Sequence, residues 1–261
     1  MYFAGIDVGS NTTKAVIIKD SIVVGKSITK TGGIAMKSAT EVYQRALTLA
    51  QINQEKITAS VATGYGRNLV KEMGNYQITE ITCFARGAFE TNPQTRTIID
   101  IGGQDSKVIR IDEKGRVTAF EMNDKCSAGT GKFLEVMANT LKLELEEIGK
   151  IVLNSDGIVS ISSTCTVFAE SEVISRIAGG TPQAHILSGL HKSMAVKVAE
   201  LAKRVSIQPD VLIAGGVAYN EGIVYYLSEQ LKTKIKIAKD PQLVGAFGAA
   251  LLASEKYANN S

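Results

Sequence analysis

Two nine-residue motifs place an aspartate, a glycine and small polar side chains in the same order. The first reads IDVGSNTTK and begins at Ile6, and the second reads IDIGGQDSK and begins at Ile99. Each aspartate follows an apolar run, which predicts a carboxylate at the end of a buried strand. The glycine after it lets backbone N–H groups approach phosphate oxygens. One copy alone would be an ordinary strand-end turn, whereas two copies with matching flanks favour phosphate binding.

The two motifs supply candidates for nucleotide chemistry. Asp7 and Asp100 are expected to hold Mg²⁺, through water. The amide of Gln104 could orient an attacking water, and Asp105 is the candidate carboxylate base for a small-molecule substrate. The candidate phosphate-binding residues are Gly9, Ser10, Asn11, Thr12, Lys14, Gly102 and Gly103.

A third glycine motif follows the apolar run at residues 211–214. A strand that runs into Gly-Gly at the start of a helix offers a flat backbone for a purine or ribose, and a helix N-terminus favours anions. Such a turn is common and gains weight only as the third element of a nucleotide site. The candidate residues are Gly215, Gly216, Val217 and Asn220.

Two of the three cysteines lie in loops of small polar residues, each ahead of a helical pattern. Cys126 and Cys165 could gain as thiolates from a helix dipole and from free N–H groups. Two thiolates would fill half the ligand set of a [4Fe-4S] cluster, with a twofold axis supplying the rest. Position alone favours two buried structural cysteines, and zinc shared between subunits is a further alternative. Cys83 has apolar neighbours and is expected in the core.

The elements around these motifs predict an α/β fold built twice. Each Asp motif opens a predicted antiparallel meander of three strands, followed by helices that alternate with single strands. The predicted helices cover residues 40–52, 131–143, 145–153, 167–177, 182–205, 220–232 and 243–257, and the single strands 57–63, 158–162, 211–214 and 235–237. We expect residues 1–95 with 239–261 to form a first lobe and 96–238 a second, with the two Asp motifs facing each other across a cleft. The last helix is expected to pack on the first lobe.

Composition narrows the classes of function. The net charge of +3 gives no case for nucleic-acid or anionic-membrane binding. No apolar run reaches the ~18 residues of a membrane span, and the N-terminus lacks the pattern of a signal peptide. A cytoplasmic protein with reduced thiols is expected.

Six segments together resemble the ATPase activators of 2-hydroxyacyl-CoA dehydratases, a group that includes the ATPase subunits of benzoyl-CoA reductase and reductases of double-cubane cluster proteins. They read IDVGSNTTKAVI, ATGYGRN, IDIGGQDSKVI, MNDKCSAGTGKFLEVMA, ISSTCTVFAESEVIS and GGVAYN. The resemblance implies the duplicated ribonuclease-H-like fold of actin, sugar kinases and heat-shock chaperones. No chemistry follows from ATGYGRN itself, which is expected to shape a cleft loop.

The resemblance also implies a homodimer that binds ATP or ADP and shares one [4Fe-4S] cluster. Cys126 and Cys165 become its ligands, and Gly129 and Thr130 further candidates for cofactor binding. Reduced ferredoxin or flavodoxin would load the cluster, and ATP hydrolysis would drive the electron to an iron–sulfur partner, a dehydratase or related reductase. Two alternatives stay open: a small-molecule kinase of the same superfamily, and a nucleotide-gated interaction protein with structural cysteines.

Overall fold

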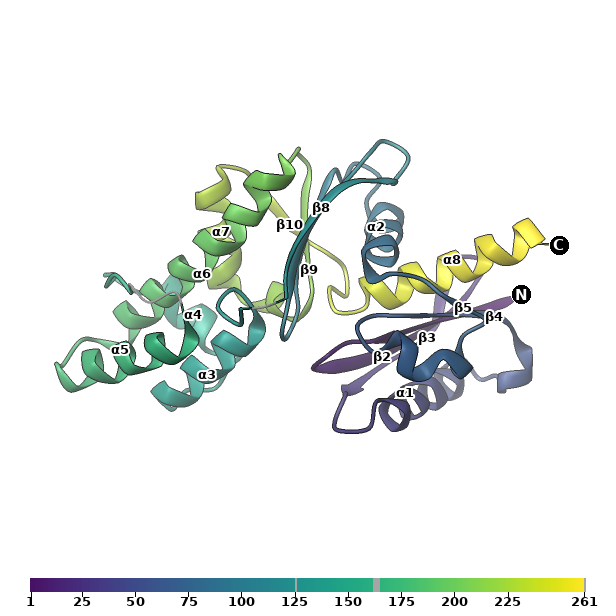
Figure 1. Cartoon of the computed structure of the whole chain (residues 1–261), viewed down its shortest axis with the longest axis horizontal. Helices are drawn as coiled ribbons and strands as arrows, with labels where there is room; N and C mark the ends of the chain where they lie inside the picture. Colours follow the sequence, from purple (N-terminus) through teal and green to yellow (C-terminus); the bar gives the residue numbers. More distant parts are fainter. Residues whose placement is uncertain (125, 162–164, 261) are drawn as a thin grey trace. The chain divides into compact units, whose positions relative to one another are not determined.

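The computed structural model describes residues 1–124, 126–161 and 165–260 (Figure 1). The described chain divides into two compact units. The first contains Met1–Ile98, Ile111–Thr118 and Ala238–Ser261, and the second contains Ile99–Arg110 and Ala119–Ile237.

The first unit is built on a mixed sheet in the order β3-β2-β1-β4-β5. β1 pairs antiparallel with β2, and β2 pairs antiparallel with β3, which confirms the first predicted meander. On its other side β1 pairs parallel with β4. Asp20 and Ser21 turn the chain from β2 into β3 with φ of 52° and 62°, a conformation that matches the twist of a tight hairpin. The elements are β1 Tyr2–Val8, β2 Thr12–Lys19, β3 Ile22–Lys30, α1 Ala35–Leu49, the 3₁₀ helix Gln54–Lys56, β4 Ile57–Thr63, the 3₁₀ helix Arg67–Met73, β5 Tyr76–Gln77, α2 Glu80–Thr91 and α8 Val244–Asn260.

Both faces of this sheet are covered because its central strands are apolar on both sides. Ile17 packs in the cluster with α1, whereas its neighbours Val16 and Ile18 pack in the cluster with α8. This alternation follows from the two-residue period of a strand. Figure 1 shows α1 and α8 on opposite faces of the sheet. The final helix therefore packs on the first unit, as predicted.

The second unit is built on a sheet in the order β10-β9-β6-β7-β8. The second Asp motif connects β6 to β7, so both copies of the motif join adjacent strands. The elements are β6 Thr97–Ile101, β7 Ser106–Ile111, β8 Val117–Asn123, α3 Gly131–Leu141, α4 Ile148–Leu153, α5 Thr166–Ala178, α6 Gln183–Val205, β9 Val211–Ala214, the 3₁₀ helix Gly216–Tyr219, α7 Glu221–Leu231 and β10 Ile235–Ile237.

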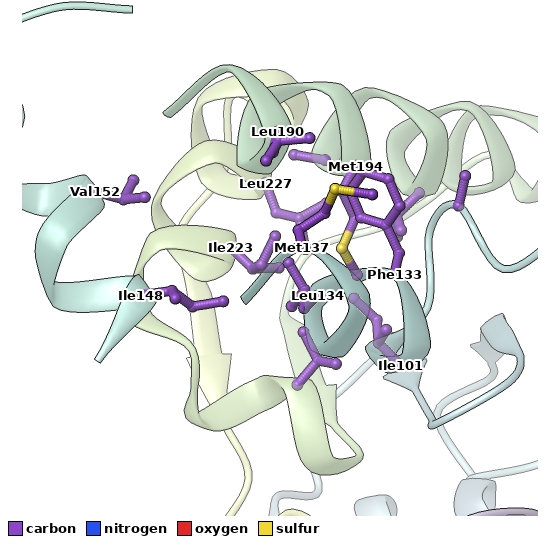
Figure 2. Packing of buried hydrophobic residues seen from close by; sticks show 14 of the residues in the cluster. Ile101, Phe133, Leu134, Met137, Ile148, Val152, Leu190, Met194, Ile223 and Leu227 are labelled. Atoms are coloured by element: carbon purple, nitrogen blue, oxygen red, sulfur yellow. The ribbon is translucent and has the colours of Figure 1, made fainter. Parts of the chain in front are cut away.

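One large apolar cluster holds the helices of the second unit together. Side chains from α3, α4, α6 and α7 converge in it, among them Phe133, Met137, Leu190 and Ile223 (Figure 2). Interdigitated side chains of this size fix the relative positions of these helices, because close-packed interiors tolerate few voids.

The predicted strand at residues 158–162 is wrong for residues 158–161, and Ser162 lies outside the described residues. Val159 donates its backbone N–H to the carbonyl of His185, near the start of α6, at 3.2 Å. Ser160 accepts from the guanidinium of Arg176 on α5 at 3.4 Å. The apolar run is therefore bonded to helices rather than to a neighbouring strand.

Candidate functional site

The first Asp motif forms a turn between β1 and β2 with a buried ion pair beneath it. Asp7 is 3% exposed, and Lys14 donates from Nζ to its Oδ2 at 3.2 Å. The two residues meet because the antiparallel register places Asp7 directly opposite Lys14. The backbone N–H of Gly9 donates to the carbonyl of Thr12 at 3.1 Å and closes the turn.

Threonine hydroxyls brace the same turn from within. Thr31 donates from Oγ1 to the carbonyl of Gly9 at 2.7 Å, and its Oγ1 lies 3.0 Å from Oγ1 of the buried Thr13. Ser10 and Thr12 are half-buried and Asn11 is exposed. The predicted phosphate-binding side chains thus sit on a turn whose backbone is held in place by other residues.

The second Asp motif repeats this geometry and adds a carboxylate. Asp100 is 2% exposed, and Lys107 donates from Nζ to its Oδ2 at 3.2 Å. Gly102 donates its N–H to the carbonyl of Asp105 at 2.9 Å, as Gly9 does to Thr12. Lys107 also reaches Oδ1 of Asp105 at 2.8 Å. One ammonium therefore serves two carboxylates here, whereas Lys14 pairs with one.

Gly64 and Gly215 occupy equivalent places, one in each unit. Both have positive φ, 87° and 82°. A Cβ on Gly64 would overlap Oδ1 of Asp7 and approach the carbonyl oxygen of Val8 to 2.6 Å. A Cβ on Gly215 would overlap the carbonyl oxygen of the residue after Asp100 and approach Oδ1 of Asp100 to 2.6 Å. Each motif aspartate is thus closely packed against a glycine, and neither glycine position has room for a side chain.

This equivalence explains the ATGYGRN segment, which the sequence left without chemistry. Its first glycine, Gly64, directly follows β4, just as Gly215 directly follows β9. The signal in the sequence was a strand that ends in small residues and glycine, but only the fold shows which aspartate that glycine contacts.

The remaining residues of the third motif differ in burial and in role. Asn220 caps α7, since its Oδ1 accepts from the N–H of Ile223 at 3.0 Å. Val217 is buried in the main apolar cluster, whereas Gly216 is exposed. Contact of these residues with a nucleotide stays a prediction.

Cys126 and Cys165 are both exposed, and Cys83 is fully buried in α2. Cys165 is the N-cap residue of α5. Cys126 does not start a helix, because α3 begins only at Gly131. The side chain of Asn123 instead holds the backbone of Cys126 from both sides: its amide donates to the carbonyl at 2.8 Å, and its oxygen accepts from the N–H at 3.2 Å.

The two cysteine loops are joined directly. Oγ of Ser127 lies 2.7 Å from Oγ1 of Thr166, so the residues that follow the two cysteines share a hydrogen bond. Gly129 adopts φ of 112°, and Thr130 is buried and donates its hydroxyl to the carbonyl of Ser127 at 2.7 Å. The sequence predicted neither the Ser127–Thr166 bond nor the clamp by Asn123, since both depend on tertiary placement.

The profile of the BadF/BadG/BcrA/BcrD ATPase family matches residues 4–253. The chain belongs to this family. It is 47% identical over 98% of both chains to the "activator of lactoyl-CoA dehydratase" of Anaerotignum propionicum. It is 46% identical over 99% of both chains to the "(R)-2-hydroxyglutaryl-CoA dehydratase activating ATPase" of Acidaminococcus fermentans. The predicted resemblance is confirmed, and the chain is an ATPase of this family.

Solved structures support the same fold. The "activator of the 2-hydroxyisocaproyl-CoA dehydratase" from Clostridium difficile, with bound ADPNP, has a TM-score of 0.94 at 43% identity, covering 100% of this chain and 97% of that one. A ROK family glucokinase from Streptomyces griseus has a TM-score of 0.58 at 13% identity over 98% and 100% of the two chains. The duplicated fold shared with sugar kinases is therefore confirmed. Among the described residues no helix is both long and apolar enough to cross a membrane.

Proposed function

We propose that this ATPase activates a 2-hydroxyacyl-CoA dehydratase or a related reductase by delivering a low-potential electron. The observation that carries the proposal is the pair of exposed cysteines, Cys126 and Cys165, on two loops joined by a hydrogen bond. Both lie in the compact unit that contains the second Asp motif. The relatives' names supply the class of partner, because they are activators of such dehydratases.

The donor set fits a cluster shared by two copies of the chain. The described residues contain no group of three or more His, Cys, Asp or Glu that could hold a metal ion, and Cys83 is fully buried in the first unit's core. Each chain thus offers two accessible thiols, half of the four that a [4Fe-4S] cluster needs. A twofold axis that brings Cys126 and Cys165 of two chains together would supply all four, so the protein would act as a homodimer.

Such a cluster would store one electron at low potential, supplied by reduced ferredoxin or flavodoxin. The chain's own residues do the rest. The two Asp motifs bind the ATP phosphates and, through Asp7 and Asp100, Mg²⁺. Their lysines hold each carboxylate in place through a buried ion pair. For one electron, ~59 mV corresponds to ~1.4 kcal/mol, so a ~200 mV gain needs roughly 5 kcal/mol. Nucleotide can provide that energy only by contacting two conformational states differently.

The proposal is tested by anaerobic reconstitution followed by iron, sulfide and mass analysis. We expect a brown dimer with about four irons per two chains. Cys126→Ser and Cys165→Ser should lose iron and keep ATP binding, whereas Asp7→Ala should keep iron and lose ATP binding. Cys83→Ser is the matched control, because it removes a thiol from the core and should retain the iron. Full iron in Cys126→Ser protein would refute the assignment of the ligands.

A further inference from the structure

The hydrogen bond between the two cysteine loops joins them one residue beyond each thiol. Ser127 follows Cys126 directly, and Thr166 follows Cys165 and is the first residue of α5. Their hydroxyl oxygens are 2.7 Å apart, a favourable distance for an O–H···O hydrogen bond, and the bond is half-buried. Any displacement of α5 relative to the Cys126 loop must lengthen or break this bond.

Few buried contacts hold α5 in place. Of its 13 residues only Ala169 and Val173 are buried, whereas Val167 and Phe168 are 66% and 68% exposed. Figure 1 shows α5 beside α3, and a side-chain hydrogen bond joins the two helices, from Thr140 Oγ1 to Glu170 Oε1 at 3.0 Å. Where so little apolar surface is buried, one hydrogen bond contributes a large share of the helix's positional stability.

On the other side, the Cys126 loop is tied to the second Asp motif. The carbonyl of Ser127 accepts from the N–H and the hydroxyl of Thr130, at 3.0 and 2.7 Å. The next two N–H groups donate to the motif itself: Gly131 to the carbonyl of Gly102, and Lys132 to that of Gly103, each at 2.8 Å. Hydrogen bonds therefore run without a gap from the glycines of the motif to the loop of Cys126.

We propose that Ser127 and Thr166 are positioning residues whose hydrogen bond sets the place of Cys165 and α5 relative to Cys126. The same bond passes to α5 any movement that a nucleotide causes in the Gly102–Gly103 turn. The proposal deepens the proposed function, on which the meaning of the cysteines rests. Its effect on α5 is nevertheless measurable in cluster-free protein.

The test is amide hydrogen exchange of α5 in the full-length apo protein, with and without ADPNP. Ser127→Ala and Thr166→Val each remove one hydroxyl. We expect α5 amides to exchange about fivefold faster in either variant, the factor that corresponds to ~1 kcal/mol for one neutral hydrogen bond. The double variant should be no faster than the single ones, because all three lack the same bond. ADPNP should protect α5 in the wild type and have little effect on it in these variants.

Two controls separate the hydroxyl pair from general damage to α5. Thr166→Ser keeps the hydroxyl and should exchange like the wild type. Ser171→Ala removes another α5 hydroxyl, which bonds within its own helix to the carbonyl of Val167 at 3.3 Å, and should also leave the response to ADPNP intact. Wild-type exchange in both Ser127→Ala and Thr166→Val, or additive effects in the double variant, would overturn the proposal.

A redox readout distinguishes this proposal from the proposed function. In reconstituted protein, Ser127→Ala and Thr166→Val should bind iron as the wild type does and show a changed electron paramagnetic resonance line shape, since one ligand loop is less constrained. If no protein binds iron but α5 exchanges as expected, the proposed function fails and the positioning role of the pair stands. If iron binds and neither exchange nor line shape changes, the positioning role fails and the proposed function stands.

Discussion

His191 should make the stability of the second unit depend on pH. Its side chain is fully buried in α6, and Nδ1 lies 2.8 Å from the carbonyl oxygen of Leu187. Burial lowers the pKa of His191 from 6.5 to about 4, because the charged ring would lose its hydration. Between about pH 4 and 6.5 the unfolded chain therefore binds more protons at this site than the folded one. Stability contributed by neutral His191 is complete above pH 6.5 and is lost as the pH falls through this window.

The size of the effect follows from the pKa. A difference of one pKa unit is worth ~1.4 kcal/mol, so His191 costs about 2 kcal/mol at pH 5 relative to pH 8, and about 3 kcal/mol near pH 4. The assay is urea unfolding at pH 8 and pH 5. Wild type should lose about 2 kcal/mol more than His191→Gln, whose amide can still donate to Leu187 but does not titrate. Parallel pH profiles of the two proteins would refute the reasoning.

The control for this experiment is the other histidine. His185 is half-buried, with its Nε2 2.7 Å from Oδ1 of the exposed Asp156. His185→Gln should keep the loss of stability at pH 5, because His191 is still present. Carboxylates contribute to the change in stability with pH in every variant, and their contribution cancels when the wild type and a variant are compared over the same two pH values.

Three further outcomes follow from the geometry. In urea titrations, Gly64→Ala should lower the free energy of unfolding by about 3 kcal/mol, because positive φ and overlap with Asp7 both oppose a side chain. Gly33→Ala is the control and should change the free energy of unfolding little, because the space around Gly33 is open. In native apo protein a thiol reagent should modify two cysteines and reach Cys83 only on unfolding, since burial raises the pKa of its thiol to about 12. Lys107→Met should cost ~3–5 kcal/mol in urea unfolding, because the buried carboxylate of Asp100 loses its ammonium partner.

Short apolar runs bounded by turn residues were predictable from sequence. The strands β4, β9 and β10 have the bounds that their patterns predict, and the helices of the second half differ by a few residues. The helix α2 at Glu80–Thr91 was missed. Its buried residues are mostly small, namely Cys83, Phe84, Ala85, Gly87 and Ala88, because it packs closely against the Gly- and Ala-rich α8. A helix that buries small residues lacks the leucine stripe on which periodicity depends.

The candidate site was predictable in its residue types and not in its contacts. Repetition in the sequence identified both Asp motifs. In the first motif the strand register explains why Asp7 meets Lys14, and the second motif has the matching ion pair between Asp100 and Lys107. The hydrogen bond between Ser127 and Thr166 joins positions 39 residues apart, and no local pattern predicts such a contact. The same limitation explains why Cys126 was expected at a helix N-terminus: a loop ahead of a helical pattern does not reveal how many residues separate the two.

The two Asp motifs share the same backbone turn but differ in their number of carboxylates. This difference in charge affects which part of the nucleotide each motif would bind. Thr12 in the first motif corresponds to Asp105 in the second, so Lys14 balances one carboxylate whereas Lys107 is shared by two. The second motif carries two carboxylates and the first carries one, so the second repels an anion more strongly. A divalent cation has the opposite preference, because hard cations select carboxylate oxygens. Within the proposed function, in which Asp7 and Asp100 both hold Mg²⁺, this difference gives the second motif the stronger Mg²⁺ contact and brings the phosphates nearer the first. An exchange of Thr12 and Asp105 between the motifs would then keep the total charge and still weaken nucleotide binding.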